Sequence, residues 1–148
     1  MERHLRGTAT TRIDDKGRLK LPAMHRSVIE ARYGPLLWIT SFDRGQSVRV
    51  YPMPVWEEIE LRLKDLGSLN RTRTRFLALA NEFGQQVELD TQGRVVINQR
   101  LRQQAQISGD VVAIGQIDHL EVWNQEVRDA HVEYPTDEDW ELLTGRGI

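Results

Sequence analysis

The chain contains no cysteine, and it contains no long apolar run. A disulfide framework and a cysteine-ligated zinc site are therefore excluded. A membrane-spanning helix needs roughly 18 consecutive apolar residues, and no stretch approaches that length. The first ten residues, MERHLRGTAT, lack the apolar segment of a secretory signal. These absences favour a cytoplasmic protein that does not associate with a membrane.

Residues suited to catalysis are also sparse. The four histidines are scattered, with no pair at metal-ligand spacing, at His4, His25, His119 and His131. Asp14 and Asp15 are neighbours, but adjacent carboxylates on a strand point in different directions. The glycines do not have the spacing of a phosphate-binding loop. The sequence therefore predicts no enzyme, no catalytic residue, no metal site, no cofactor and no small-molecule substrate.

Charge is distributed unevenly along the 148 residues. Residues 1–102 carry 18 Lys and Arg against 12 Asp and Glu, whereas residues 103–148 carry 2 against 10. The formal net charge of −2 therefore hides a basic part and an acidic part. A basic face for a polyanion and an unevenly charged solvated surface are both compatible with this pattern.

A short segment occurs twice. Asp14 to Pro22 reads DDKGRLKLP, and Asp90 to Asn98 reads DTQGRVVIN. The two copies are 76 residues apart, and the same offset also aligns Arg26 with Arg102. An aspartate can accept hydrogen bonds from backbone N–H groups in a turn, and glycine adopts positive φ at little cost. We therefore assign structural roles in two equivalent turns to Asp14, Gly17, Asp90 and Gly93.

The surrounding pattern predicts one unit repeated twice. The first copy is expected to contain strands at 7–13 and 18–21, a helix at 23–33, and strands at 36–40 and 48–51. The second copy is expected to contain strands at 85–89 and 94–97, a helix at 99–106, and strands at 111–114 and 120–123. Two helices, at 55–66 and 72–83, join the copies, and Thr136 begins a short final helix through Leu143. The predicted domains are 7–54, 55–83, 84–127 and 128–148.

Four cations lie in or beside the first repeated segment. Arg18 and Lys20 share one face of a strand, Lys16 lies at the turn, and Arg12 precedes it. Such a hairpin can bind phosphates and enter a major groove, where arginine pairs with guanine. Alternatively, Arg18 pairs with Asp14 as a structural contact that Arg94 and Asp90 repeat. Both interpretations remain open.

The doubled Asp-x-x-Gly-Arg motif, together with YPMPVWEEIE and VAIGQIDHLEVWN, resembles the MraZ proteins, which contain two tandem SpoVT-AbrB-like domains. The similarity extends to about Trp123. It implies an α+β fold, a pseudo-symmetric swapped-hairpin AbrB-like β-barrel formed by two tandem β-β-α-β-β repeats with linking helices.

The resemblance also implies a function. It points to a bacterial, sequence-specific DNA-binding transcriptional regulator that acts on repeated promoter elements of the division and cell-wall operon. The implied partners are double-stranded DNA and further copies of the chain in a ring-like homo-oligomer, located at the nucleoid.

The family's motif arginine corresponds to Arg18, with Lys16 beside it, and to Arg94. In the second copy, Gln92, Val96 and Asn98 replace Lys16, Lys20 and Pro22. That hairpin is therefore expected to serve packing or assembly. The alternative function is a non-enzymatic structural or protein-interaction module that uses its acidic C-terminal surface.

Overall fold

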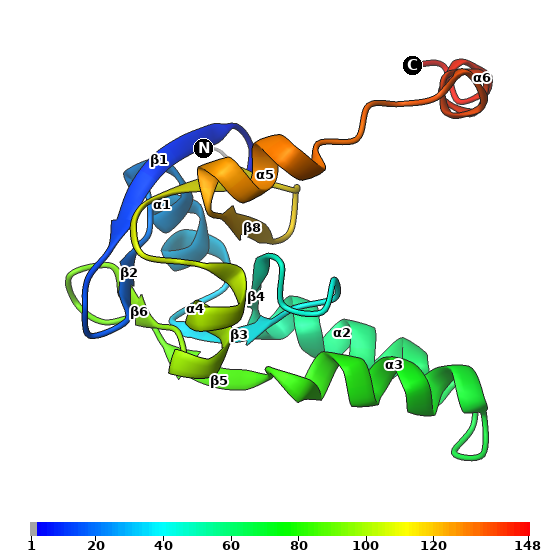
Figure 1. Cartoon of the computed structure of the whole chain (residues 1–148). Coiled ribbons are helices and arrows are strands. Elements are labelled where there is room, and N and C mark those ends of the chain that lie inside the picture. The colour runs from blue at the N-terminus through cyan, green and yellow to red at the C-terminus, as the bar shows by residue number, and fades with distance from the viewer. Residues whose placement is uncertain (1–2) are drawn as a thin grey trace.

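The computed structural model describes residues 3–148 and forms a barrel from which helices project (Figure 1). The first half of the chain forms β1 (Thr8–Ile13), β2 (Arg18–Lys20), α1 (Ala23–Arg32), β3 (Leu36–Thr40) and β4 (Val48–Pro52). The linking helices are α2 (Met53–Lys64) and α3 (Arg71–Glu82). The second half forms β5 (Gln85–Glu88), β6 (Arg94–Val96), α4 (Gln99–Ala105), β7 (Gly109–Gly115) and β8 (Leu120–Trp123). Two further helices follow, α5 (Gln125–His131) and α6 (Asp137–Gly145).

One of these helices, α5, was not expected from the sequence. It begins after Asn124, whose side chain accepts a hydrogen bond from the backbone N–H of Val127 at 3.1 Å. Such a cap satisfies a donor that the first helical turn leaves open. The segment has too few apolar residues to show a helical period, so the cap was its only local signal.

The eight strands form one antiparallel sheet in the order β5-β3-β4-β8-β7-β1-β2-β6. The strands at the two ends of this order, β5 and β6, are consecutive in the chain and contact each other. The sheet therefore curls into a nearly closed barrel, which protects most strand edges from pairing with other chains.

The two halves interleave. β1 pairs with β7 along six residues, and β5 pairs with β3, whereas β1 and β2 share only the pair Ile13↔Leu19. At the centre, Leu19 pairs with Val95, its own equivalent in the second repeat. Each half thus supplies a strand that completes the sheet of the other. This confirms the expected α+β swapped-hairpin barrel.

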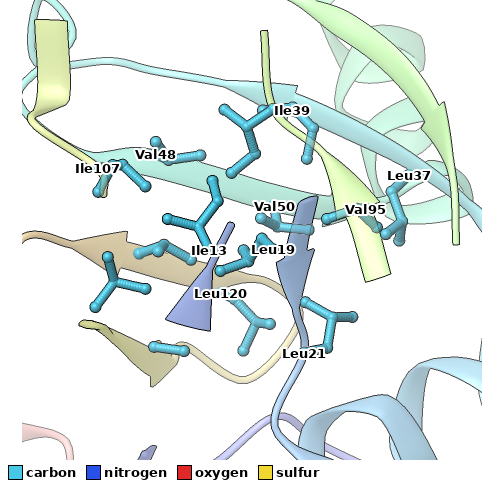
Figure 2. Close-up of a cluster of buried hydrophobic side chains, with 14 of the residues drawn as sticks. Ile13, Leu19, Leu21, Leu37, Ile39, Val48, Val50, Val95, Ile107 and Leu120 are labelled. Carbon is cyan, nitrogen blue, oxygen red and sulfur yellow. The ribbon is translucent and has the colours of Figure 1, made fainter. Parts of the chain in front are cut away.

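The barrel interior holds the main hydrophobic core (Figure 2). Leu19 and Val95 point inward from β2 and β6, and Leu37 and Val50 reach the same interior from β3 and β4. All four side chains are at most 1% exposed. Burial of one such side chain contributes about 1.5 to 3 kcal/mol relative to exposure. This core holds β2 and β6 side by side.

A second cluster attaches α2 and α3 to the outside of the barrel. Trp56 of α2 is 1% exposed and stacks on Trp38 of β3, with ring centroids 5.6 Å apart. Phe76 of α3 approaches Trp56 at 6.3 Å and Phe42 at 5.2 Å. The base of the helical hairpin is therefore anchored, while its far end extends away from the barrel (Figure 1).

Candidate nucleic-acid interface

The turn between β1 and β2 is organised by the carboxylate of Asp14. Its Oδ1 accepts hydrogen bonds from the backbone N–H groups of Lys16 at 3.0 Å and Arg18 at 2.9 Å. Its Oδ2 accepts a hydrogen bond from the Arg18 guanidinium Nε at 2.6 Å. The sequence therefore specified this turn locally, through residues no more than four positions apart.

The turn between β5 and β6 has the same network. Asp90 Oδ1 accepts from the backbone N–H groups of Gln92 at 2.8 Å and Arg94 at 2.9 Å, and Oδ2 accepts from Arg94 Nε at 3.1 Å. The structural contact considered for Arg18 and Arg94 is thus present in both repeats. It holds each guanidinium in one orientation.

Because these hydrogen bonds favour the ionised carboxylate, they lower the pKa of both aspartates. The largest contribution to the lowered pKa of Asp14 is the backbone N–H of Arg18, and for Asp90 it is the backbone N–H of Arg94. A lowered pKa in the folded state means that the unfolded chain binds protons first. The stability contributed by these carboxylates is complete above their ordinary pKa and is lost as the pH falls through the lower, folded-state value.

We therefore expect the Asp14→Asn/Asp90→Asn variant to lose thermal stability less steeply than the wild type below about pH 4. Thermal unfolding midpoints measured from pH 7 to pH 3 check this. Asp15→Asn is the control, because it removes the neighbouring carboxylate, which accepts none of these hydrogen bonds. Parallel pH curves for wild type and double variant would contradict the expectation.

Each turn is also held by the opposite repeat. The backbone N–H of Ile97 donates across the repeats to the Gly17 carbonyl at 2.9 Å. Arg102 Nε donates within its own repeat, to the Ile97 carbonyl at 2.9 Å. In the other direction, the N–H of Leu21 donates to the Gly93 carbonyl at 2.9 Å. Arg26, the equivalent of Arg102, donates to a carbonyl of the β5–β6 turn at 2.9 Å. The two turns therefore form one reciprocal unit.

The pairing of β2 with β6 gathers cations on one face. Lys20 lies opposite Arg94 in the ladder, and Arg18 lies opposite Val96. Directly opposed residues share a face of a sheet. Since the intervening pair Leu19 and Val95 is buried in the barrel, this face points outward. We call the outward set the cation face, consisting of Arg12, Lys16, Arg18, Lys20 and Arg94.

The members of the cation face differ in how far their charge is compensated. Arg12 forms an exposed ion pair with Asp110 at 3.1 Å, a type of contact that contributes little to stability. Within residues 3–148, Lys16 and Lys20 form no ion pair. These two lysines therefore supply the charge that remains available to a polyanion.

The structure places Arg94 of the second hairpin beside cations of the first. Considered alone, the second hairpin has Gln92 and Val96 in place of Lys16 and Lys20, and it was expected to serve packing or assembly. In the barrel, Arg94 lies directly across from Lys20. The candidate surface is therefore not a free two-stranded hairpin of the first repeat, because both repeats contribute to it. No signal in the sequence showed that β2 pairs with β6.

Residues 3–148 contain no group of three His, Asp or Glu side chains placed to hold a metal ion. In the same range, no helix combines the length and apolarity needed to cross a membrane.

The interleaved repeats and doubled Asp–Arg turns define a tandem AbrB-like swapped-hairpin protein. Comparison with known sequences identifies the family. A family profile described as "MraZ protein, putative antitoxin-like" matches residues 84–134. The chain is 42% identical to the transcriptional regulator MraZ of Acidobacterium capsulatum over 145 residues, covering 97% of this chain and 99% of the relative.

Two further relatives have the same name. The transcriptional regulator MraZ of Koribacter versatilis is 44% identical, with 97% of this chain and 99% of the relative covered. That of Syntrophobacter fumaroxidans is 30% identical, with 98% and 97% covered. The chain therefore belongs to the MraZ family. Because transcriptional regulators are not a class of enzymes, this membership confirms the expectation of a non-enzymatic protein.

Proposed function

We propose that this protein is a transcriptional regulator that binds double-stranded DNA in a sequence-specific manner through its cation face. Its targets would be repeated promoter elements of the division and cell-wall operon, and its place of action the nucleoid. The observation that carries the proposal is the gathering of Arg18, Lys20 and Arg94 on the outward face of the β2–β6 pair. The names of the relatives support a role in transcription.

Arg18 is the residue best suited to read a base. Asp14 holds its Nε at 2.6 Å, and its terminal amino groups have no partner within residues 3–148. A guanidinium oriented in advance loses less conformational entropy on binding. Its two terminal donors match O6 and N7 of guanine. Lys16, Lys20 and Arg12 would contact phosphates and set the register of the protein on the duplex.

Repeated DNA elements require more than one cation face. We propose that copies of the chain assemble into a ring-like homo-oligomer that presents successive cation faces to consecutive repeats. Once one face is bound, the next binding event is intramolecular and benefits from a high effective concentration. Weak single contacts can therefore add up to firm binding.

A titration against two duplexes tests the proposal. One duplex contains the repeats upstream of the protein's own coding region, and the other contains the same bases in scrambled order; both are measured at two salt concentrations. We expect tighter binding to the repeats and weaker binding to both duplexes at the higher salt. Equal affinities would exclude sequence specificity. If the protein binds neither duplex at moderate salt, the result would instead favour the alternative function, a structural or protein-interaction module.

The lysines provide a separate prediction. Lys16→Gln/Lys20→Val gives the first repeat the residues of the second, and it should weaken binding to repeat and scrambled DNA alike. Each lost phosphate contact is expected to reduce the slope of log affinity against log salt by about 1. Arg44→Gln is the control, because it removes one exposed positive charge from the β3–β4 loop. An effect confined to the repeat duplex would show that the lysines read sequence.

A further inference from the structure

The last helix, α6, is formed without support from the rest of the molecule. It lies at the end of an extended segment, apart from the barrel (Figure 1). Thr136 and Asp139 form a capping box, in which Thr136 Oγ1 accepts from the Asp139 N–H at 3.1 Å and Asp139 Oδ2 accepts from the Thr136 N–H at 2.8 Å. Isolated helices of this length are marginal in water. Docking onto another surface would stabilise it.

One face of α6 is apolar and bordered by carboxylates. Trp140 is 54% exposed, and Leu143 lies one turn further along the same face. Asp137 lies one turn before Trp140, and Glu141 lies one turn after Asp137 along the border of this face. From residue 129 to residue 145 there are six carboxylates and no lysine or arginine. A partner for this face must therefore be both apolar and basic.

Such a surface exists at the far end of the α2–α3 hairpin. Leu61, Leu66 and Leu69 are 62%, 48% and 94% exposed. Residues 61–75 carry five basic side chains and a single acidic one, and one of the five, Arg62, is already paired with Glu58 at 3.8 Å. We call this region the hairpin tip; its basic residues are Arg62, Lys64, Arg71, Arg73 and Arg75. Exposed apolar groups with charged surroundings are typical of protein interaction sites.

We propose that α6 of one copy docks on the hairpin tip of a neighbouring copy. Trp140 and Leu143 would cover the exposed leucines, while the carboxylates of α6 face the tip arginines. In Figure 1, α6 and the tip lie at different ends of one molecule, so the contact joins two copies. Because the two surfaces differ, the contact is head-to-tail, and repetition of it closes a ring or extends a filament. The inference rests on the self-assembly in the proposed function and names its contact.

Charge reversal on each side tests this contact in the full-length chain. Asp137→Lys/Glu141→Lys and Arg71→Glu/Arg75→Glu are each expected to reduce the assembly, measured by light scattering, to monomers or small species. Combining all four changes in one chain should restore the mass of the wild type. Trp140→Ser should disperse the assembly without changing any charge. The barrel should keep its fold in every variant, since both surfaces lie outside the barrel core, and circular dichroism checks this.

The matched control is Glu126→Lys/Asp129→Lys on α5, which makes the same charge change and should leave the mass unchanged. A monomeric wild type, normal assembly of either reversal, or failure of the combined variant to restore the mass would each overturn the inference. Binding to a duplex with one repeat separates it from the proposed function. Each variant should bind that duplex within about twofold of the wild type, because the cation face is intact.

If Arg71→Glu/Arg75→Glu assembles normally but no longer binds DNA, the hairpin tip is a DNA-binding surface. That result would overturn the proposed docking of α6. If no variant and no wild-type protein binds the duplex, the proposed function fails. Dispersal by each reversal and restoration by their combination would still support the contact between copies.

Discussion

Arg18→Ala is expected to weaken binding to each specific repeat by about 1 to 3 kcal/mol, corresponding to a 5- to 150-fold loss of affinity. The substitution removes the two terminal amino groups, which have no partner within residues 3–148. It should also reduce the preference for the repeat over scrambled DNA, because phosphate contacts carry no sequence information directly. On a duplex with several repeats the loss is expected to be larger, since every linked contact is weakened.

Fluorescence titration against single-repeat, tandem-repeat and scrambled duplexes measures this effect, with light scattering to verify the assembly. Arg94→Ala is the companion variant, because Arg94 also belongs to the cation face and makes the same contact with its own aspartate. We expect it to harm folding or assembly more than DNA binding, and to weaken DNA binding less than Arg18→Ala does. Unchanged binding by Arg18→Ala in an intact assembly would refute the assignment. Equal loss of DNA binding by an intact Arg94→Ala assembly would show that the second repeat contributes as much to DNA contact as the first.

Gly17→Ala is expected to destabilise the fold by about 2 to 4 kcal/mol, combining a left-handed backbone with a steric clash. Gly17 has φ +82°, where a side chain costs about 1 to 2 kcal/mol. A Cβ atom there would lie 2.7 Å from Arg102 Nε and 2.9 Å from the Ile97 carbonyl oxygen. The oxygen belongs to the backbone and cannot move away freely, so the two repeats would have to separate locally.

Gly67→Ala separates the two contributions. Gly67 has nearly the same backbone angle, φ +83°, but a Cβ atom there would meet nothing within 4 Å. It should therefore lose only the conformational part, about 1 to 2 kcal/mol. Urea unfolding of both variants gives the two free energies of unfolding. Equal losses would mean that contact across the repeats contributes nothing at Gly17.

Features formed by residues close together in the chain could be predicted from the sequence, whereas pairings between distant residues could not. The Asp14 and Asp90 turns involve residues no more than four positions apart, so the doubled motif was enough to predict them. The final helix was likewise marked by Thr136 and its cap. The α5 helix was not predicted, because its apolar residues are too few to recur at helical spacing. The resemblance implied interleaved repeats, yet it did not show that Lys20 and Arg94 would lie opposite each other.

By itself, the sequence determined where the charge lies and where each element except α5 forms. Local structure depends on turn carboxylates, glycines with positive φ and the alternation of apolar residues. These features act over a few positions, so they can be recognised in the sequence alone. Only the tertiary structure decided which strands pair, because registers such as Leu19↔Val95 join residues far apart in the chain. That pairing places an arginine of the second repeat among the cations of the first. It also shows why Gly17 tolerates no side chain, since Arg102 and Ile97 of the other repeat occupy the space.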